Sequence, residues 1–293
     1  MKFLITGASG LLGHKLAELA IDAGHDVTCV YNEHPTTRGN GVQVDLRNPG
    51  AIRKVLIKSA PDVVVHTASV TDVDLCERRP QLAMEVNGEV TGLIARICDE
   101  LNSSLVYVSS DYVFDGQRGH YVESDEPNPV NTYGRSKLLG EEKVSNFAGN
   151  YCTVRTSVLF GSGRDYRPNL ATWLLAQLSS GKSVNVINSQ YASPTLNSHL
   201  AKMLLEVAER RITGIIHLAG ADRLNRYEFA VRLAREFGFD VGLLIPGAQN
   251  TINWYAKRPA DSSISIEKGT RLLNTKPITV DDELRAFRVE LQK

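Results

Sequence analysis

Short apolar runs rich in Val and Ile alternate with longer amphipathic segments along the first half of the chain. The apolar runs predict strands at 2–6, 26–31, 41–45, 62–67, 104–109 and 151–157. Segments with helical spacing of apolar residues predict helices at 11–23, 49–58, 81–101 and 132–147. Strands that alternate with helices indicate βαβ units and a parallel sheet. Because the strands are almost continuously apolar, both faces of the sheet should be covered by helices, as in a doubly wound α/β fold.

The pattern changes after about residue 160. A Gly-rich and charged stretch at 161–167 is followed by predicted helices at 168–180, 196–210 and 226–237 and predicted strands at 183–188 and 214–219. Residues 238–263 are rich in loop formers, and one or two short helices are expected beyond them. No linker separates the two parts. We therefore divide the chain into a sheet domain, residues 1–160, and residues 161–293, mainly a small lobe interleaved with late strands and helices of the sheet domain.

Composition argues against several classes of function. The 293 residues include 33 basic and 33 acidic side chains, so no charge excess favours a nucleic-acid partner. No apolar run approaches the roughly 20 residues that span a bilayer. Met1 leads directly into the first predicted strand, so we expect no signal peptide and no membrane partner. The four cysteines form no C-x-x-C pair, which predicts reduced thiols and a cytoplasmic protein, and the seven histidines show no metal-ligand spacing, so no metal is expected.

A glycine-rich turn joins the first predicted strand to the first predicted helix. Gly7, Gly10 and Gly13 stand at G-x-x-G-x-x-G spacing, which allows a tight turn, close approach of a pyrophosphate and close packing of helix on sheet. The helix N-terminus adds free N–H groups and a partial positive charge. This context predicts that residues 1–160 form an NAD(P)-binding Rossmann domain. The turn residues assigned to the cofactor are Gly7, Ser9, Gly10, Leu11 and Leu12.

The end of the second predicted strand bears on the choice between NADP and NAD. An acidic residue there would bind the ribose hydroxyls of NAD, but Asn32 follows the strand and Glu33 is expected to lie too far along the loop. Arg38 suits a 2′-phosphate because its guanidinium pairs bidentately with phosphate, although a solvated loop charge is the alternative. NADP(H) is therefore favoured, with NAD(H) as the alternative. Asp45 and Leu46 are assigned to the adenine edge, with helix capping as the alternative for Asp45.

The candidate chemistry centres on a tyrosine and a lysine. Tyr133 and Lys137 have Y-x-x-x-K spacing within a predicted helix, so they share one helix face. An ammonium near a phenol lowers the pKa of the phenol, which would make Tyr133 a proton donor and acceptor near neutral pH, and Lys137 could also bind the nicotinamide ribose. Ser110 stands at the carboxyl end of a predicted parallel strand, where ligands bind in such sheets, and its hydroxyl could polarise a substrate carbonyl. Capping is the alternative for Ser110.

Together these residues resemble the extended short-chain dehydrogenase/reductases, and within them the dTDP-4-dehydrorhamnose reductase family. Residues 109–116, S-S-D-Y-V-F-D-G, are similar to the family signature S-T-D-Y-V-F-D-G. Further agreement lies at 61–66, 71–74, Asn87, 128–137, 155–157 and 258–268. The resemblance covers nearly the whole chain. It implies a Rossmann domain with a small C-terminal sugar-nucleotide lobe, and NAD(P)H-dependent reduction of dTDP-4-dehydrorhamnose to dTDP-L-rhamnose.

The resemblance also implies roles for individual residues. Tyr133 would protonate the new alkoxide while hydride arrives from the nicotinamide, and Lys137 would tune Tyr133 and hold the ribose. Ser110 replaces the more usual threonine and keeps the hydroxyl. Arg258 would lie near the nucleotide phosphates. The residues assigned to the substrate are Thr71, Val73, Ser110, Tyr133 and Arg258. The further residues assigned to the cofactor are Asn32, Arg38, Asp45, Leu46, Thr67, Ala68, Ser69, Tyr133 and Lys137.

Two positions depart from the family pattern. Val158 stands where the family often has a tryptophan against the substrate, and His66 replaces a small residue or asparagine. Both changes leave the sugar and the nucleotide base open. One alternative is a reductase or epimerase for another nucleotide sugar. The other is an NADP-binding regulatory subunit, because the chain also resembles the β subunit of methionine adenosyltransferase. A homodimer is possible, since exposed helices in this superfamily often pair.

Overall fold

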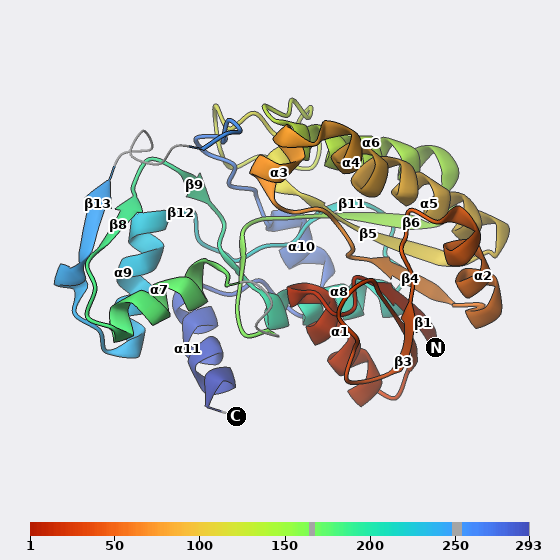
Figure 1. The fold of residues 1–293 in the computed structure, drawn as a ribbon, viewed down its shortest axis with the longest axis horizontal. Coiled ribbons are helices and arrows are strands. Elements are labelled where there is room, and N and C mark those ends of the chain that lie inside the picture. The colour runs from red at the N-terminus through yellow and green to blue at the C-terminus, as the bar shows by residue number, and fades with distance from the viewer. Residues whose placement is uncertain (164–167, 248–253, 293) are drawn as a thin grey trace.

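Seven parallel strands form the central sheet of the protein (Figure 1). A computed structural model describes residues 1–163, 168–247 and 254–292, so parts of the predicted loops at 161–167 and 238–263 lie outside the described residues. The strand order is β11-β6-β5-β4-β1-β2-β3. The strands are β1 (Lys2–Thr6), β2 (Asp26–Tyr31), β3 (Asn40–Gln43), β4 (Val63–His66), β5 (Ser104–Ser110), β6 (Tyr151–Thr156) and β11 (Gly214–His217). The order changes direction between β1 and β4, so the predicted doubly wound α/β fold is confirmed.

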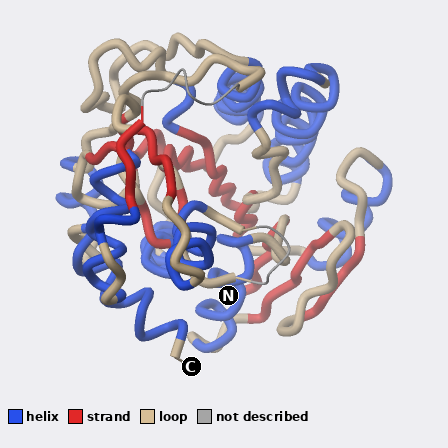
Figure 2. The backbone as a smooth tube through the Cα atoms, turned by 60° about the vertical axis from the view of Figure 1, so that its left-hand side comes forward, coloured by secondary structure: helices blue, strands red, loops and turns tan. Residues whose placement is uncertain are grey.

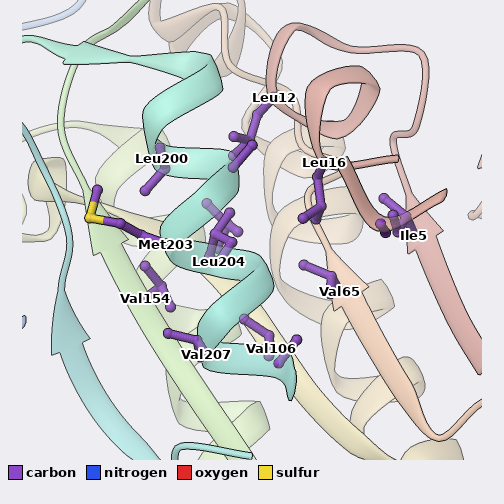
Figure 3. Packing of buried hydrophobic residues seen from close by; sticks show 14 of the residues in the cluster. Ile5, Leu12, Leu16, Val65, Val106, Val154, Leu200, Met203, Leu204 and Val207 are labelled. Carbon is purple, nitrogen blue, oxygen red and sulfur yellow. The ribbon is translucent and has the colours of Figure 1, made fainter. Parts of the chain in front are cut away.

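Helices cover both faces of this sheet. On one face lie α1 (Leu11–Asp22) and α8 (Asn197–Glu209), which pack against each other and against the strands, as Figure 3 shows. On the other face lie α2 (Pro49–Ser59), α5 (Val90–Glu100) and α6 (Thr132–Phe147). Alternate strand residues enter the two cores. Val63 and Val65 belong to the first, while Val64 between them belongs to the second. Each such fully buried side chain contributes about 1.5–3 kcal/mol, which explains the unbroken apolar runs.

The predicted helix at 81–101 is interrupted in its middle. It begins with α4 (Pro80–Ala83), widens to a π-helical segment, η1 (Met84–Glu89), and continues as α5. A further helix that the sequence did not predict, α3 (Val73–Arg78), precedes it. Asp72 caps α3 by accepting a hydrogen bond from the Leu75 amide at 2.9 Å.

A third core lies in the C-terminal half. It is built on α7 (Leu170–Ser179), α9 (Arg226–Phe237) and α11 (Val280–Leu291), with edge-to-face contacts of Phe160 with Phe229 and Phe287 at 5.0 and 5.9 Å. In Figures 1 and 2 the β8–β13 pair stands apart from the central sheet, at the end of the molecule opposite β3. The remaining elements are β7 (Leu159–Phe160), β8 (Val184–Ile187), β9 (Tyr191–Ala192), β10 (Thr195–Leu196), β12 (Leu224–Asn225), β13 (Leu244–Gly247), α10 (Glu267–Leu272), η2 (Asp111–Val113) and η3 (Val241–Leu243). Within the described ranges, no helix combines the length and apolarity required to cross a membrane.

Candidate active site

A cleft of about 840 Å³ opens at the carboxyl ends of β1, β4, β5 and β6. Its walls come from the central sheet and from the C-terminal half, including residues of β12 and α9. All predicted site residues except Arg38 and Asp45 line it. Those that line it are Gly7, Ser9, Gly10, Leu11, Leu12, Asn32, Leu46, Thr67, Ala68, Ser69, Thr71, Val73, Ser110, Tyr133, Lys137 and Arg258.

The glycine turn has the geometry expected of a phosphate site. Gly7 has φ +65°, and a Cβ there would lie 2.8 Å from the Cα of Ala68, so only glycine fits against the loop after β4. A Cβ on Gly13 would lie 2.2 Å from the carbonyl oxygen of Gly7, which explains the close approach of α1 to the turn. Gly10 is the N-cap of α1 and offers no side chain to its first amides. Those N–H groups are suited to an anionic ligand in the cleft.

The end of the cleft near β2 differs from the sequence prediction. Arg38 donates a hydrogen bond to Asp22 at 2.5 Å on the exposed surface. Asp45 accepts a hydrogen bond from Arg47 at 2.6 Å. Neither Arg38 nor Asp45 lines the cleft, because each carries its own surface ion pair. Glu33, which was expected to lie too far away, does line the cleft. Asp45 does not cap α2 either.

The N-cap of α2 is Asn48, which accepts a hydrogen bond from the Ala51 amide at 3.1 Å. The end of the cleft near β2 therefore has the acidic Glu33 on its wall, whereas Arg38 lies outside the lining.

Helix α6 carries Tyr133 and Lys137 to the centre of the cleft. The helix begins at the N-cap Asn131, whose side chain accepts from the Gly134 amide and donates to the carbonyl of Lys257, both at 2.9 Å. Lys137 donates from Nζ to the carbonyl of Val108 at 2.7 Å, and its ammonium lies 4.3 Å from the centre of the Tyr107 ring. The lysine is thereby directed to the end of β5.

Burial dominates the ionisation of both residues. Removal from water raises the pKa of Tyr133 far above its usual range, and the Ser110 hydroxyl, which hydrogen-bonds the phenol, opposes this effect. Burial lowers the pKa of Lys137 to about 7, against an opposing contribution from Glu141. The pKa of Tyr133 is therefore raised, and not lowered as its spacing from Lys137 had suggested, because desolvation dominates it. The phenol of Tyr133 keeps its proton at neutral pH.

A buried ion pair ties α6 to the sheet one turn beyond Lys137. Glu141 receives hydrogen bonds from Arg155 of β6 at 2.7 to 3.2 Å and from Ser109 of β5 at 2.5 Å. The side chains of Glu141 and Arg155 are 6% and 2% exposed. The helix that carries Tyr133 and Lys137 is thus joined to both strands beneath the cleft.

Ser110 has both a capping and a cleft-lining position. Its hydroxyl accepts a hydrogen bond from the Tyr112 amide at 3.1 Å and donates to Asp111 at 3.0 Å. Asp111 also receives hydrogen bonds from Ser157 at 2.8 Å and Ser262 at 2.6 Å. Burial raises the pKa of Asp111 to about 6, although these hydroxyls oppose the rise. Asp111 was not predicted as a site residue. Its position directly after the end of β5 could have indicated it.

Asn87 of the π-helical segment links the loop after β4 to α6. Its oxygen accepts from Ser69 at 2.9 Å and from the Val70 amide at 2.8 Å. Its nitrogen donates to the Val70 carbonyl at 3.1 Å and to Ser136 at 2.9 Å. The cofactor-assigned loop and the helix of Tyr133 are therefore held by one buried amide.

Two guanidinium groups lie at the other end of the cleft. Arg258 pairs with Asp74 at 3.0 Å, and both Arg258 and Arg226 line the cleft. Trp254 contacts both, with its ring 5.2 Å from the guanidinium carbon of Arg258 and 5.6 Å from that of Arg226. Arg226, which the sequence analysis did not single out, adds a second cation. Within the described part of the chain, no group of three or more His, Cys, Asp or Glu residues is placed to hold a metal.

The arrangement defines a class of protein. A glycine turn after β1, a hydroxyl at the end of β5 and a Tyr–Lys pair on α6 surround one cleft at the point where the strand order changes direction. These are the features of an NAD(P)-dependent oxidoreductase of the extended short-chain dehydrogenase/reductase type.

Comparison with known proteins identifies the family within this class. Residues 1–292 match the family described as RmlD substrate binding domain, and the chain belongs to this family. The predicted resemblance to dTDP-4-dehydrorhamnose reductases is thereby confirmed.

Two relatives illustrate the range of the family. The chain is 31% identical over 291 residues to a probable low-salt glycan biosynthesis reductase of Haloferax volcanii, covering 98% of this chain and 97% of the relative. It is 30% identical over 274 residues to subunit beta of methionine adenosyltransferase 2 from Danio rerio, covering 91% of this chain and 83% of the relative.

Solved structures agree with the fold. A hypothetical dTDP-4-dehydrorhamnose reductase from Sulfolobus tokodaii is 37% identical with a TM-score of 0.88, covering 97% of this chain and 99% of that one. The dTDP-4-dehydrorhamnose reductase of Bacillus anthracis, solved in complex with NADP, is 26% identical with a TM-score of 0.89, and the match covers 99% of both chains.

Proposed function

We propose that the protein uses NADPH to reduce the 4-keto group of a nucleotide sugar, and that dTDP-4-dehydrorhamnose, converted to dTDP-L-rhamnose, is its substrate. The observation that carries the proposal is that Ser110, Tyr133 and Lys137 line one cleft together with the glycine turn. The similarity to structures named as dTDP-4-dehydrorhamnose reductases supports this choice of sugar.

The chemistry follows from the protonation of Tyr133. Reduction adds a hydride to the carbonyl carbon and a proton to its oxygen, and bound NADPH would supply the hydride. Because burial raises the pKa of Tyr133, the phenol enters the reaction protonated, as a reductase requires. Tyr133 donates this proton to the oxygen, which leaves a secondary alcohol and a phenolate. Ser110, which donates to Asp111 in the free protein, would redirect its hydroxyl proton to the same oxygen, and the Lys137 ammonium would stabilise the phenolate.

The residues of the cleft fit a dinucleotide. Gly7 packs too closely against Ala68 for any side chain, and the amides after Gly10, which no side chain caps, suit a pyrophosphate. Thr67, Ala68 and Ser69 would lie along the nicotinamide half, held by Asn87.

NADP(H) remains the favoured cofactor, with NAD(H) as the alternative. The NADP bound by the Bacillus anthracis relative supports this preference. In this chain Arg38 would have to exchange Asp22 for the 2′-phosphate, while Glu33 lines the same end of the cleft and could bind a 2′-hydroxyl.

The nucleotide-sugar half would occupy the other arm of the cleft. Arg258 and Arg226 supply two cations for a diphosphate, and Thr71 and Val73 lie nearby on the cleft wall. Val158 lines the cleft as well, so the ring of the sugar has no tryptophan against it at this position.

The test is NADPH oxidation, followed by absorbance, with a panel of 4-keto nucleotide sugars that includes dTDP-4-dehydrorhamnose, and with NMR identification of the product. We expect turnover of dTDP-4-dehydrorhamnose to dTDP-L-rhamnose. Turnover of a different keto sugar alone would replace the proposed substrate.

The matched control is Tyr133→Phe, which should retain NADPH but not turn over. The similarity to subunit beta of methionine adenosyltransferase 2 keeps a regulatory role as the second candidate. Tight NADP binding without turnover of any sugar, together with co-purification of a methionine adenosyltransferase, would favour that role.

A further inference from the structure

Two buried side-chain atoms on the cleft wall have no hydrogen-bond partner among the residues that the structure describes. They are Oγ1 of Thr156 and Nε2 of Gln190, and each residue is 6% exposed. Thr156 ends β6 and pairs in register with Ser110 of β5. Paired residues of parallel strands point to the same face, and neighbouring strands lie about 4.8 Å apart. The hydroxyl of Thr156 therefore belongs to the end of the cleft where Ser110 lies.

Gln190 is held on the adjoining wall. The segment that follows it is joined to the end of β6, because the Ser193 amide donates to Ser157 at 3.1 Å. The amide of Tyr191, next to Gln190, donates to the carbonyl of Ala260 at 2.8 Å. Hydrogen bonds at Tyr191 and Ser193 thus hold the backbone that directly follows Gln190 against two other segments of the protein.

Two neighbouring polar residues that also line the cleft, Asp111 and Ser157, are paired within the protein. Asp111 accepts hydrogen bonds from three serines, and Ser157 both donates to Asp111 and accepts from Ser193. A buried polar atom without a partner is unfavourable, and most such atoms in proteins are paired. Two unpaired atoms that line the same cleft therefore indicate partners on a ligand.

We propose that Thr156 and Gln190 form a subsite for hydroxyl groups on the sugar ring of the nucleotide sugar. This inference rests on the proposed function. A threonine hydroxyl donates and accepts, and a glutamine amide offers a donor at one end and an acceptor at the other. A ring hydroxyl, which also does both, satisfies them. A sugar that lacks the hydroxyl leaves them unpaired, so the subsite selects among sugars and not among nucleotides.

The test uses Thr156→Val and Gln190→Met, which approximate the original shapes and remove the polar atoms. Titration calorimetry in the presence of saturating NADP⁺ would compare dTDP-rhamnose, dTDP-glucose and UDP-glucose, each beside its nucleoside diphosphate. We expect each substitution to weaken the nucleotide sugar bound by the wild type by about tenfold, while affinities for its nucleoside diphosphate and for NADP⁺ change by at most about twofold.

Stability provides a second readout with a matched control. Thr195 is buried, lies outside the cleft lining, and has a fully paired hydroxyl that donates to the Ser193 carbonyl at 2.8 Å and accepts from the Gly220 amide at 3.1 Å. Thr195→Val should lower the urea midpoint of the free protein, whereas Thr156→Val should leave it unchanged or raise it.

The outcomes separate the inference from the proposed function. Unchanged sugar affinity in both cleft variants overturns the subsite and leaves the reductase proposal intact. Weaker NADP⁺ binding by Thr156→Val assigns that hydroxyl to the cofactor and also overturns the subsite. If the wild type binds none of the nucleotide sugars, the proposed function fails and the inference fails with it.

Discussion

Glu283 should make the stability of the protein fall as pH rises. Its side chain lies on α11, which packs in the C-terminal core, is 0% exposed, and has no cationic partner among the described residues. Burial raises its pKa from 4.5 to about 8, and the charge of Asp222 adds to the rise. The carboxyl is therefore protonated in the folded protein at neutral pH.

The sign and size of the effect follow from linkage. Between pH 4.5 and about 8 the folded chain holds a proton that the unfolded chain has released, so unfolding becomes easier as pH rises through this window. Each unit of difference between those two pKa values corresponds to about 1.4 kcal/mol. The carboxyl therefore changes the free energy of unfolding by at most about 5 kcal/mol. Most of it, about 3 kcal/mol, is lost between roughly pH 5 and pH 8.

The assay is urea unfolding of the wild type and Glu283→Gln, which keeps the shape and cannot ionise. The glutamine variant should gain about 3 kcal/mol relative to the wild type between pH 5 and pH 8. Glu100→Gln, at an exposed position on α5, is the control and should change stability by less than about 1 kcal/mol at both pH values. A constant difference between Glu283→Gln and the wild type across this range would refute the reasoning.

Three further predictions concern the site. Tyr133→Phe should lower kcat by about 10²–10⁴-fold with NADPH affinity nearly unchanged, as measured by steady-state kinetics and fluorescence titration, and normal turnover would remove the phenol from the chemistry. Arg38→Ala should weaken NADPH more than NADH in the same titration, whereas equal effects would contradict a 2′-phosphate contact. Glu141→Gln leaves the Arg155 charge buried without a counter-charge and should lower the free energy of unfolding by about 3–5 kcal/mol in urea; a loss below about 1 kcal/mol would argue against a buried ion pair.

The sequence predicted the features whose geometry is local. The glycine turn is one strand–turn–helix unit, and Tyr133 and Lys137 are one helical turn apart, so spacing alone places their side chains. The strands and most helices followed from periodicity because both faces of the sheet are buried. The short helix α3 was missed, since its six residues contain only a weak apolar pattern.

The remaining features depend on contacts between distant segments. Arg38 has the chemistry of a phosphate ligand, but Asp22 on α1 holds it in the structure. The raised pKa of Tyr133 comes from burial by the whole cleft wall, which helix spacing does not report. Gln190 and Arg226 come from segments without a recognised motif. The division of the chain at residue 160 and the homodimer stay predictions.

The hydrogen bonds of Asp111 have a consequence for how the protein can be divided. One of its three serine donors, Ser262, is 151 positions away in sequence, and the strand beside β6 is supplied by residues 214–217. A fragment that stopped at residue 160 would keep the glycine turn, Tyr133 and Lys137. The Asp111 carboxyl would keep its donors Ser110 and Ser157 but lose Ser262. Such a fragment would also lack Arg258 and Ser262 of the cleft wall, so this cleft is assembled from both halves of the sequence.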